Sequence, residues 1–146
     1  MSDIKFRLAD RSDIDKISIL ENSYQYEVYS EDELKNMFDI AYYTFLVAVI
    51  DDEIIGYICS TIIYDNCDLL KIIVNKDYRK QSIGRMLIQK LIDICKEKCV
   101  GNITLEVREN NNIAISFYEK IGFEQLGKRK GYYNGEDAKI YRLQIK

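Results

Sequence analysis

The sequence predicts a mixed α/β (α+β) fold, in which about four helices flank a mostly antiparallel central sheet of about seven strands. The chain has 146 residues and no low-complexity segment, which fits one domain spanning residues 1–146. Segments that alternate apolar and polar residues, as strands do, occur at both ends of the chain. Between them, a strand, a loop, a helix and a second strand follow one another over residues 68–107. This order indicates a crossover connection, and hence a mixed sheet.

The first half of the chain predicts four strands and two helices. Asp10 or Ser12 can cap the first helix, and Ser30 and Glu33 form a capping box for the second. The apolar face of the first helix comprises Ile14, Ile17, Leu20 and Tyr24, and that of the second comprises Leu34, Met37 and Phe38. The expected strands are 4–8, 43–50, 54–64 and 68–74, with turns at 51–53 and 65–66.

The second half predicts a long helix, a strand, a short helix and a terminal hairpin. The helices cover 83–98 and 111–121, and we expect Ile113, Phe117 and Ile121 to form the apolar stripe of the shorter one. In the strand at 102–107, Thr104 and Glu106 lie on the face opposite the apolar residues. The hairpin strands are 123–133 and 138–145, joined by an Asn134-Gly135 turn.

Composition excludes several function classes. The chain has no histidine, which removes Ser-His-Asp chemistry, deprives a cysteine nucleophile of its usual base and argues against a metal site. The cysteines, Cys59, Cys67, Cys95 and Cys99, include no C-x-x-C pair and are expected to be reduced and mostly buried. The net charge of −3 argues against direct nucleic-acid binding. The longest apolar run, Phe45–Ile50, is too short to cross a membrane, so we expect a cytoplasmic protein.

The run DYRKQSIGRML at residues 77–87 joins a predicted strand to a predicted helix. A helix N-terminus offers free N–H groups and a positive dipole end, and Gly84 lets a phosphate approach the backbone. Arg79, Lys80 and Arg85 add positive charge. On its own, such a run is more often the solvated start of an ordinary helix.

The spacing of this run resembles a known coenzyme-binding loop. Residues 79–84 read R-x-x-S-x-G, similar to the Q/R-x-x-G-x-G/A pyrophosphate loop of the GNAT superfamily of acetyl-coenzyme A (acetyl-CoA)-dependent N-acetyltransferases. The resemblance implies that Arg79, Lys80, Gln81, Ser82, Ile83, Gly84 and Arg85 bind the coenzyme. Ser82 departs from the pattern, and a non-glycine residue there carries a conformational cost if its φ is positive.

A second run, LEVRENNNIAISFYEKIGF at residues 105–123, resembles the L-E-V-R-x-x-N-x-x-A-x-x-x-Y-x-x-x-G-F pattern of the ribosomal-protein alanine N-acetyltransferases (RimI type). YYNGEDA at 132–138 is similar to the tail of that family. Substrate-side segments differ: Gly131 replaces an asparagine, Asn134 a proline, and Val28-Tyr29-Ser30 the usual P-W-S. The resemblance is close from about Asp68 to the end, and looser before it.

The resemblance assigns roles to the residues that match. In the family, the strand before the loop splays from its neighbour, so that backbone groups here at Ile72, Ile73 and Val74 would bind the pantetheine arm and polarise the carbonyl. Asn111 is placed where the family contacts the coenzyme. The resemblance thus implies acetyl-CoA as co-substrate and no metal.

Acetyl transfer to an amine also needs a base and an acid. The resemblance makes Glu106 the base, acting through a water molecule, and Tyr118 the acid for the leaving sulfur. From the residues alone, the favoured interpretation of Glu106 is a solvated strand residue or a salt-bridge partner, for example of Arg108. Tyr118, one of twelve tyrosines, is equally a core residue with its hydroxyl at the surface.

Tyr29, Tyr132 and Tyr133 are the candidate walls of an acceptor groove. Glu136 and Asp137 either meet a basic peptide there or belong to the hairpin turn. Three functions follow: RimI-type acetylation of a ribosomal protein's N-terminal alanine, acetylation of another amine (polyamine, amino acid or other protein N-terminus), or a non-catalytic binding module. The expected partners are acetyl-CoA and a basic peptide or protein N-terminus, with no membrane, for a monomer or homodimer.

Overall fold

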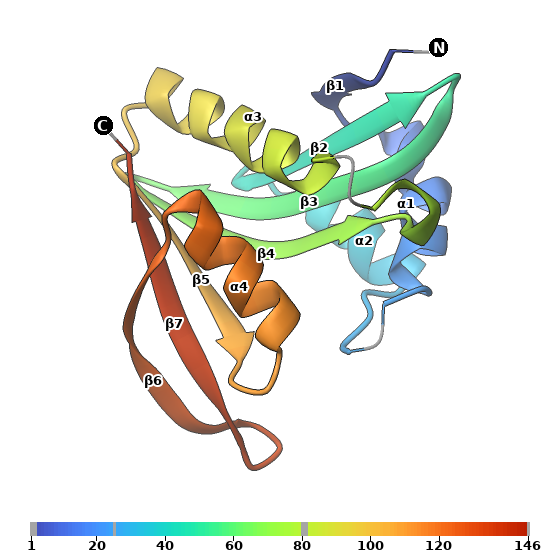
Figure 1. Cartoon of the computed structure of the whole chain (residues 1–146). Coiled ribbons are helices and arrows are strands. Elements are labelled where there is room, and N and C mark those ends of the chain that lie inside the picture. Colours follow the sequence, from blue (N-terminus) through green and yellow to red (C-terminus); the bar gives the residue numbers. More distant parts are fainter. Residues whose placement is uncertain (1–2, 25, 80–81, 146) are drawn as a thin grey trace.

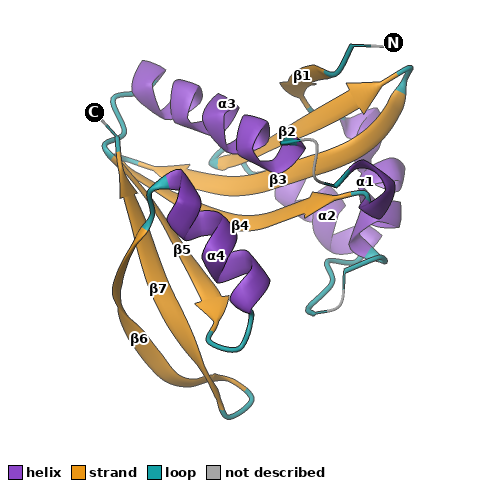
Figure 2. Ribbon diagram, viewed as in Figure 1, coloured by secondary structure: helices purple, strands orange, loops and turns teal. Residues whose placement is uncertain are grey.

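The structure, a computed structural model, describes residues 3–24, 26–79 and 82–145. Within these residues, seven strands form one sheet in the order β1-β2-β3-β4-β5-β7-β6 (Figures 1 and 2). The strands are β1 (Lys5–Leu8), β2 (Tyr43–Ile50), β3 (Glu53–Ile63), β4 (Asn66–Val74), β5 (Asn102–Arg108), β6 (Glu124–Tyr133) and β7 (Glu136–Gln144). The helices are α1 (Ile14–Glu21), α2 (Glu31–Phe38), α3 (Ile83–Glu97) and α4 (Asn112–Ile121). The predicted fold class is confirmed.

The sheet consists of two antiparallel groups joined by one parallel pair. Strands β1 to β4 pair antiparallel in chain order, and β5, β7 and β6 form a second antiparallel group. The parallel pair is β4 with β5, connected through α3 as the crossover predicts. The two groups therefore meet only along β4 and β5.

Helices cover both faces of this sheet. In Figure 1, α3 and α4 lie on the near face, and α1 and α2 lie behind the sheet. Each face has its own apolar core: Leu87, Leu91 and Tyr118 belong to the α3–α4 side, and Ile17 and Leu34 to the α1–α2 side. Burial of these helical stripes is what holds the helices on the sheet.

Local signals in the sequence explain most element ends. The Ser30 hydroxyl accepts from the Glu33 N–H at 3.1 Å, and the Glu33 carboxylate accepts from the Ser30 N–H, so the predicted capping box starts α2. Asn134 and Gly135 both have positive φ, which is the twist that a two-residue hairpin turn requires. All four cysteines are unpaired, and Cys59, Cys67 and Cys95 are buried, as predicted.

Several local predictions were wrong: Tyr24 lies beyond the end of α1, and β7 begins at Glu136 instead of Ala138. Ile113 was expected on the apolar stripe of α4 but is 87% exposed, whereas Ile115 and Tyr118 are the buried residues of that helix. The stripe is shifted because Ile113 lies in the first turn and faces away from the sheet. Strand β4 begins at Asn66 instead of Asp68, since Asn66 already pairs with Ile63 across a tight turn. None of the described helices is long and apolar enough to span a membrane.

Candidate active site

The two strands of the parallel pair separate like a fork. Pairing between β4 and β5 runs from Asn66↔Asn102 only as far as Asp68↔Thr104. Beyond that point β4 and β5 point apart, with α4 in front of β5 (Figure 1). The remaining residues of β4 have no strand on their β5 side, so their backbone groups on that edge remain open to a ligand.

A β-bulge in β4 coincides with the start of this fork. On β3, Cys59 pairs with Lys71 and Ser60 pairs with Leu69, which leaves Leu70 of β4 without a partner. An extra residue bends its strand and reverses which side chains face which side. Accordingly Leu69 packs in the α3–α4 core, whereas Ile73 packs in the α1–α2 core.

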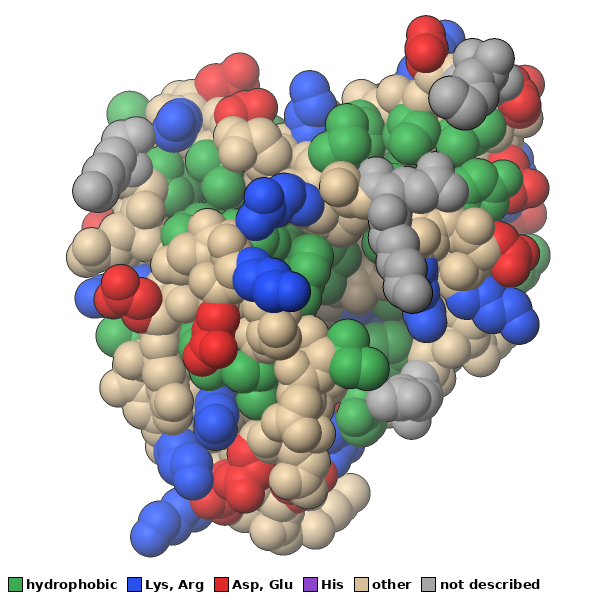
Figure 3. All heavy atoms as spheres, viewed as in Figure 1, with side chains coloured by type: hydrophobic (Ala, Val, Ile, Leu, Met, Phe, Trp, Pro, Cys, Tyr) green, Lys and Arg blue, Asp and Glu red, His purple; other side chains and the backbone are tan. Residues whose placement is uncertain are grey.

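The fork opens into a cleft of about 780 Å³. Its walls come from the segment between α1 and α2, from the diverging strands, from α4 and from the β6–β7 turn. The space-filling view shows a hollow on this face with hydrophobic side chains around it (Figure 3). The predicted site residues that line the cleft are Tyr29, Ile72, Glu106, Asn111, Tyr118, Tyr132 and Tyr133.

Other predicted site residues lie outside this lining. Ile73 is buried in the α1–α2 core, and Val74 packs against the α3–α4 core, so of the three β4 residues only Ile72 lines the cleft. The described residues of the predicted pyrophosphate loop, Arg79, Ser82, Ile83, Gly84 and Arg85, are also not in the lining. Lys80 and Gln81 lie outside the described residues.

The described part of the predicted loop leads directly into the start of α3. Ser82 is the N-cap of α3 and has a left-handed conformation, φ +63°, with no side-chain cap bond among the described residues. Helix α3 begins at Ile83, so the N–H groups of its first turn have no partner within the helix. Arg79 is exposed and donates to the Val74 carbonyl at 3.3 Å.

Gly84 connects this loop to the cleft by close packing. A Cβ at this position would lie 3.0 Å from the Phe117 ring of α4 and 3.6 Å from the Ile72 side chain. The first turn of α3 therefore packs against α4 and β4 as only a glycine permits. Arg85 next to it donates to the Lys120 carbonyl at 3.1 Å, which also joins α3 to α4.

Glu106 points from β5 into the cleft and forms an ion pair. Its Oε1 accepts a hydrogen bond from Arg129 of β6 at 2.6 Å. Arg108, the partner that the sequence suggested, instead bonds to Glu27 and to Glu136, the latter at 3.2 Å. Glu106 is thus held by a partner on the outer strand of the sheet.

Tyr118 is buried and lines the same cleft from α4. Burial, more than the neighbouring Tyr24 and Tyr133, raises the pKa of its phenol far above the ordinary value near 10. The phenol is therefore protonated at neutral pH. Asn111, at the start of α4, accepts from the Ala114 N–H at 3.2 Å, so its side-chain oxygen caps the helix.

Two cations of the cleft, Lys71 and Arg108, were not predicted as site residues. The Arg108 guanidinium lies between the rings of Tyr26 and Tyr133, 4.8 and 4.3 Å from their centroids. It also links Glu27 to Glu136, and so joins the α1–α2 segment to the hairpin turn. The sequence did contain a signal that could have identified Lys71 as a site residue, because Lys71 is the one cation in the otherwise apolar run LLKIIV.

Residues 13–123 match the Acetyltransferase (GNAT) family. The chain belongs to this family. It is therefore an acetyltransferase with the GNAT fold, and acetyl-CoA is the co-substrate, as predicted. A family match over most of the chain argues against the binding-module hypothesis.

Relatives and solved structures agree with this assignment. A Bacillus subtilis protein, provisionally named a ribosomal protein bS18-alanine N-acetyltransferase, is 34% identical over 91% of this chain and 90% of its own. The Salmonella typhimurium ribosomal protein bS18-alanine N-acetyltransferase is 35% identical over 65% of this chain and 67% of its own. The crystal structure of the Escherichia coli ribosomal-protein-S18-alanine N-acetyltransferase superposes with a TM-score of 0.89, at 27% identity over 98% of this chain and 94% of that one.

The residues present fit acetyl-CoA. The open edge of β4 offers unpaired backbone groups, and the glycine-packed first turn of α3 offers free N–H groups beside basic side chains. A PaiA N-acetyltransferase from Thermoplasma acidophilum, solved in complex with coenzyme A, has the same fold with a TM-score of 0.81 over 97% of this chain and 99% of that one, at 22% identity. No group of acidic, cysteine or histidine side chains able to hold a metal occurs among the described residues.

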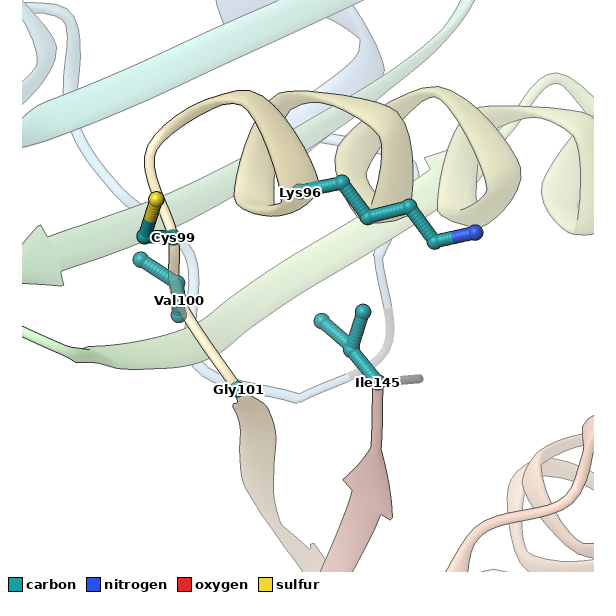
Figure 4. A pocket seen from close by; sticks show the side chains of 5 residues that line it. All are labelled: Lys96, Cys99, Val100, Gly101 and Ile145. Carbon is teal, nitrogen blue, oxygen red and sulfur yellow. The ribbon is translucent and has the colours of Figure 1, made fainter.

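A second, smaller hollow of about 380 Å³ lies at the other end of α3 (Figure 4). It is lined by Lys96, Cys99, Val100, Gly101 and Ile145. Among the described residues that line it, Lys96 is the only charged one, and neither of the candidate catalytic residues borders it. It is therefore not a candidate active site.

The conformation of Ser82 makes a testable prediction. A left-handed conformation costs a non-glycine residue about 1 kcal/mol, so Ser82→Gly should preserve or tighten acetyl-CoA binding in calorimetry. Ser82→Ala is the matched control, because it removes the hydroxyl and keeps the cost. Clear weakening in both variants would contradict the prediction and identify the hydroxyl as a phosphate ligand.

Proposed function

We propose that this acetyltransferase modifies the N-terminal alanine of a small-subunit ribosomal protein in the cytoplasm. The observation that carries the proposal is the convergence of Glu106 and Tyr118, from different elements, on one cleft beside the fork. Both belong to the run at 105–123 that resembles RimI-type enzymes, and the relatives cited above bear the name of that activity.

The coenzyme lies along the fork in this proposal. When bound, acetyl-CoA supplies the thioester whose acetyl group is transferred. The N–H groups at the start of α3, with Arg79, Lys80 and Arg85, hold the pyrophosphate, and Gln81, Ser82, Ile83 and Gly84 provide the backbone of the cradle. Open backbone groups of β4 at Ile72, Ile73 and Val74 hold the pantetheine arm and polarise the carbonyl. Asn111 contacts the coenzyme while it caps α4.

Glu106 is the general base. The acceptor arrives as an ammonium and becomes a nucleophile only after losing a proton, which the Glu106 carboxylate accepts through a water molecule. The 2.6 Å bond from Arg129 fixes the orientation of that carboxylate towards the cleft. Glu106 lies on the half of β5 that has left β4, so its side chain borders the space where the acceptor enters.

Tyr118 is the general acid. Its phenol is protonated at neutral pH, as that of an ordinary tyrosine is, and it donates its proton to the sulfur that leaves when the amine attacks. The acid and the base come from different walls of the cleft, Tyr118 from α4 and Glu106 from β5. Deprotonation of the incoming amine and protonation of the leaving sulfur can therefore occur at the same time.

The acceptor occupies the side of the cleft walled by Tyr29, Tyr132 and Tyr133. Glu27 and Glu136, held by Arg108, place negative charge beside these aromatic rings. Aromatic walls with carboxylates suit an extended peptide that carries basic residues near its N-terminus. Asp137 instead accepts from the Gly131 N–H at 2.9 Å and belongs to the hairpin.

A second acceptor class follows from one observation. Of the positions that differ from the RimI-type pattern, Tyr29 and Asn134 line the cleft, and Val28 and Gly131 lie close to them in the sequence. The same catalytic residues would then acetylate a polyamine, an amino acid or another protein N-terminus.

An acceptor panel tests the choice between these classes. We expect acetylation of a basic peptide that starts with alanine to exceed that of spermidine and of free amino acids, because only a peptide spans the tyrosine-lined walls. Thiol release and mass spectrometry measure the rates and the modified amine. Faster turnover of spermidine or a free amino acid would refute the ribosomal-protein proposal and favour the second class.

Substitution of the base tests the mechanism. Glu106→Gln keeps the shape of the side chain but cannot take a proton, so turnover should fall by about 100-fold or more while acetyl-CoA affinity stays nearly unchanged. Glu124→Gln, at an exposed position on the edge strand β6, is the matched control. Turnover of Glu106→Gln equal to that of the control would remove Glu106 from this role.

A further inference from the structure

We propose that Lys71 is a positioning residue for the acceptor: its buried ion pair with Glu21 holds the α1–α2 segment, residues 22–30, as a wall of the cleft. This inference rests on the proposed placement of the acceptor in the cleft, and not on the identity of the acceptor. It concerns a residue of β4 that takes no part in the proton transfers proposed above.

The burial of this ion pair is unusual. Lys71 is 8% exposed and Glu21 is 0% exposed, and Lys71 is the one buried lysine or arginine in the part of the chain that the structure describes. Lysine and glutamate are almost never fully buried unless they are paired. Replacing a buried ion pair by apolar residues of similar volume often leaves a protein equally stable or more stable. Stability alone is therefore a weak reason for burying these two charges.

The contacts of the pair show what it holds. Lys71 Nζ donates to Glu21 Oε1 at 2.9 Å and to the Glu27 backbone carbonyl. The same carboxylate accepts the Tyr29 N–H at 2.8 Å and the Tyr57 hydroxyl. Both carboxylate oxygens are thereby bonded, one of them to the backbone of the 22–30 segment.

Aromatic contacts add to these attachments. Lys71 Nζ lies 4.8 Å from the centroid of the Tyr24 ring and 4.1 Å from that of Tyr29. The pair thus contacts the segment at Tyr24, Glu27 and Tyr29, and each of these residues lines the cleft. The described residues of 22–30 form neither helix nor strand, so such side-chain contacts determine the path of the backbone.

Because of the bulge at Leu70, the side chain of Lys71 points towards Glu21. Without this extra residue, Lys71 would share the face of Leu69 and point towards α3 and α4. With it, Lys71 faces Glu21 at the end of α1, on the opposite side of the sheet. The irregularity beside the fork therefore also places the side chain that holds the acceptor wall.

Two variants separate positioning from stability. Lys71→Met leaves the Glu21 carboxylate buried without its cation, and is expected to lower the melting temperature. Glu21→Gln/Lys71→Met removes both charges, which restores most of the stability. The amide oxygen introduced at position 21 can still accept from the Tyr29 N–H, and the amide NH2 can donate to the Tyr57 hydroxyl oxygen. The double variant still lacks the lysine contacts to Tyr24, Glu27 and Tyr29. Lys90→Met, at an exposed position on α3, is the matched control.

The experiment measures acceptor KM and kcat, acetyl-CoA affinity by calorimetry, and hydrogen exchange of amides 22–30. The acceptor is whichever panel compound the wild type acetylates fastest, so failure of the alanine-peptide proposal does not affect this test. In the double variant we expect acceptor KM to rise about 10-fold or more, with faster exchange at 22–30 and acetyl-CoA affinity within about twofold of wild type. Wild-type KM and wild-type exchange in the stable double variant would overturn the proposal.

Discussion

The early end of pairing between β4 and β5 is the constraint on which the rest of this structure depends. The sheet is continuous only as far as Asp68 and Thr104, and its two antiparallel halves part beyond that point. Because the strands diverge, backbone groups of β4 are left open at the middle of the molecule, where a sheet is normally closed. The crossover through α3 then brings a helix N-terminus to the far end of the same strand. One break in strand pairing thus creates the cleft and the open edge, and the start of α3 adjoins them.

Ion pairs hold the walls of this cleft in place. Lys71 of β4 reaches Glu21, Arg108 of β5 reaches Glu27 and Glu136, and Arg129 of β6 reaches Glu106. Paired and aromatic-stacked charges keep their orientation better than solvated ones, and the planar guanidinium of arginine adds a fixed bonding geometry. The side of the cleft proposed for the acceptor therefore rests on charges anchored in strands, even though its walls are loops and a hairpin turn.

The fold was largely predictable because its signals are local. Alternating strands, the Ser30–Glu33 capping box and the Asn134-Gly135 turn each act over a few residues, and the structure contains all of them. The run at 105–123 placed Glu106 and Tyr118 in one cleft, because a strand and the helix after it are close in sequence. The Leu70 bulge and the Lys71–Glu21 pair were not predicted, since they depend on partners far away in the chain. Arg108 was one example of a salt-bridge partner for Glu106, but its bonds go to Glu27 and Glu136, which only the tertiary structure brings together.

Hydrogen exchange of the chain with and without saturating acetyl-CoA tests the central role of the fork most directly. If the open edge of β4 holds the coenzyme, amides in 69–75 and in 82–86 exchange more slowly when it is bound. Amides of β1 and β2, which lie away from the fork, serve as the internal reference and should not change. Unchanged exchange at 69–75 with acetyl-CoA bound, or protection confined to other strands, would contradict the account.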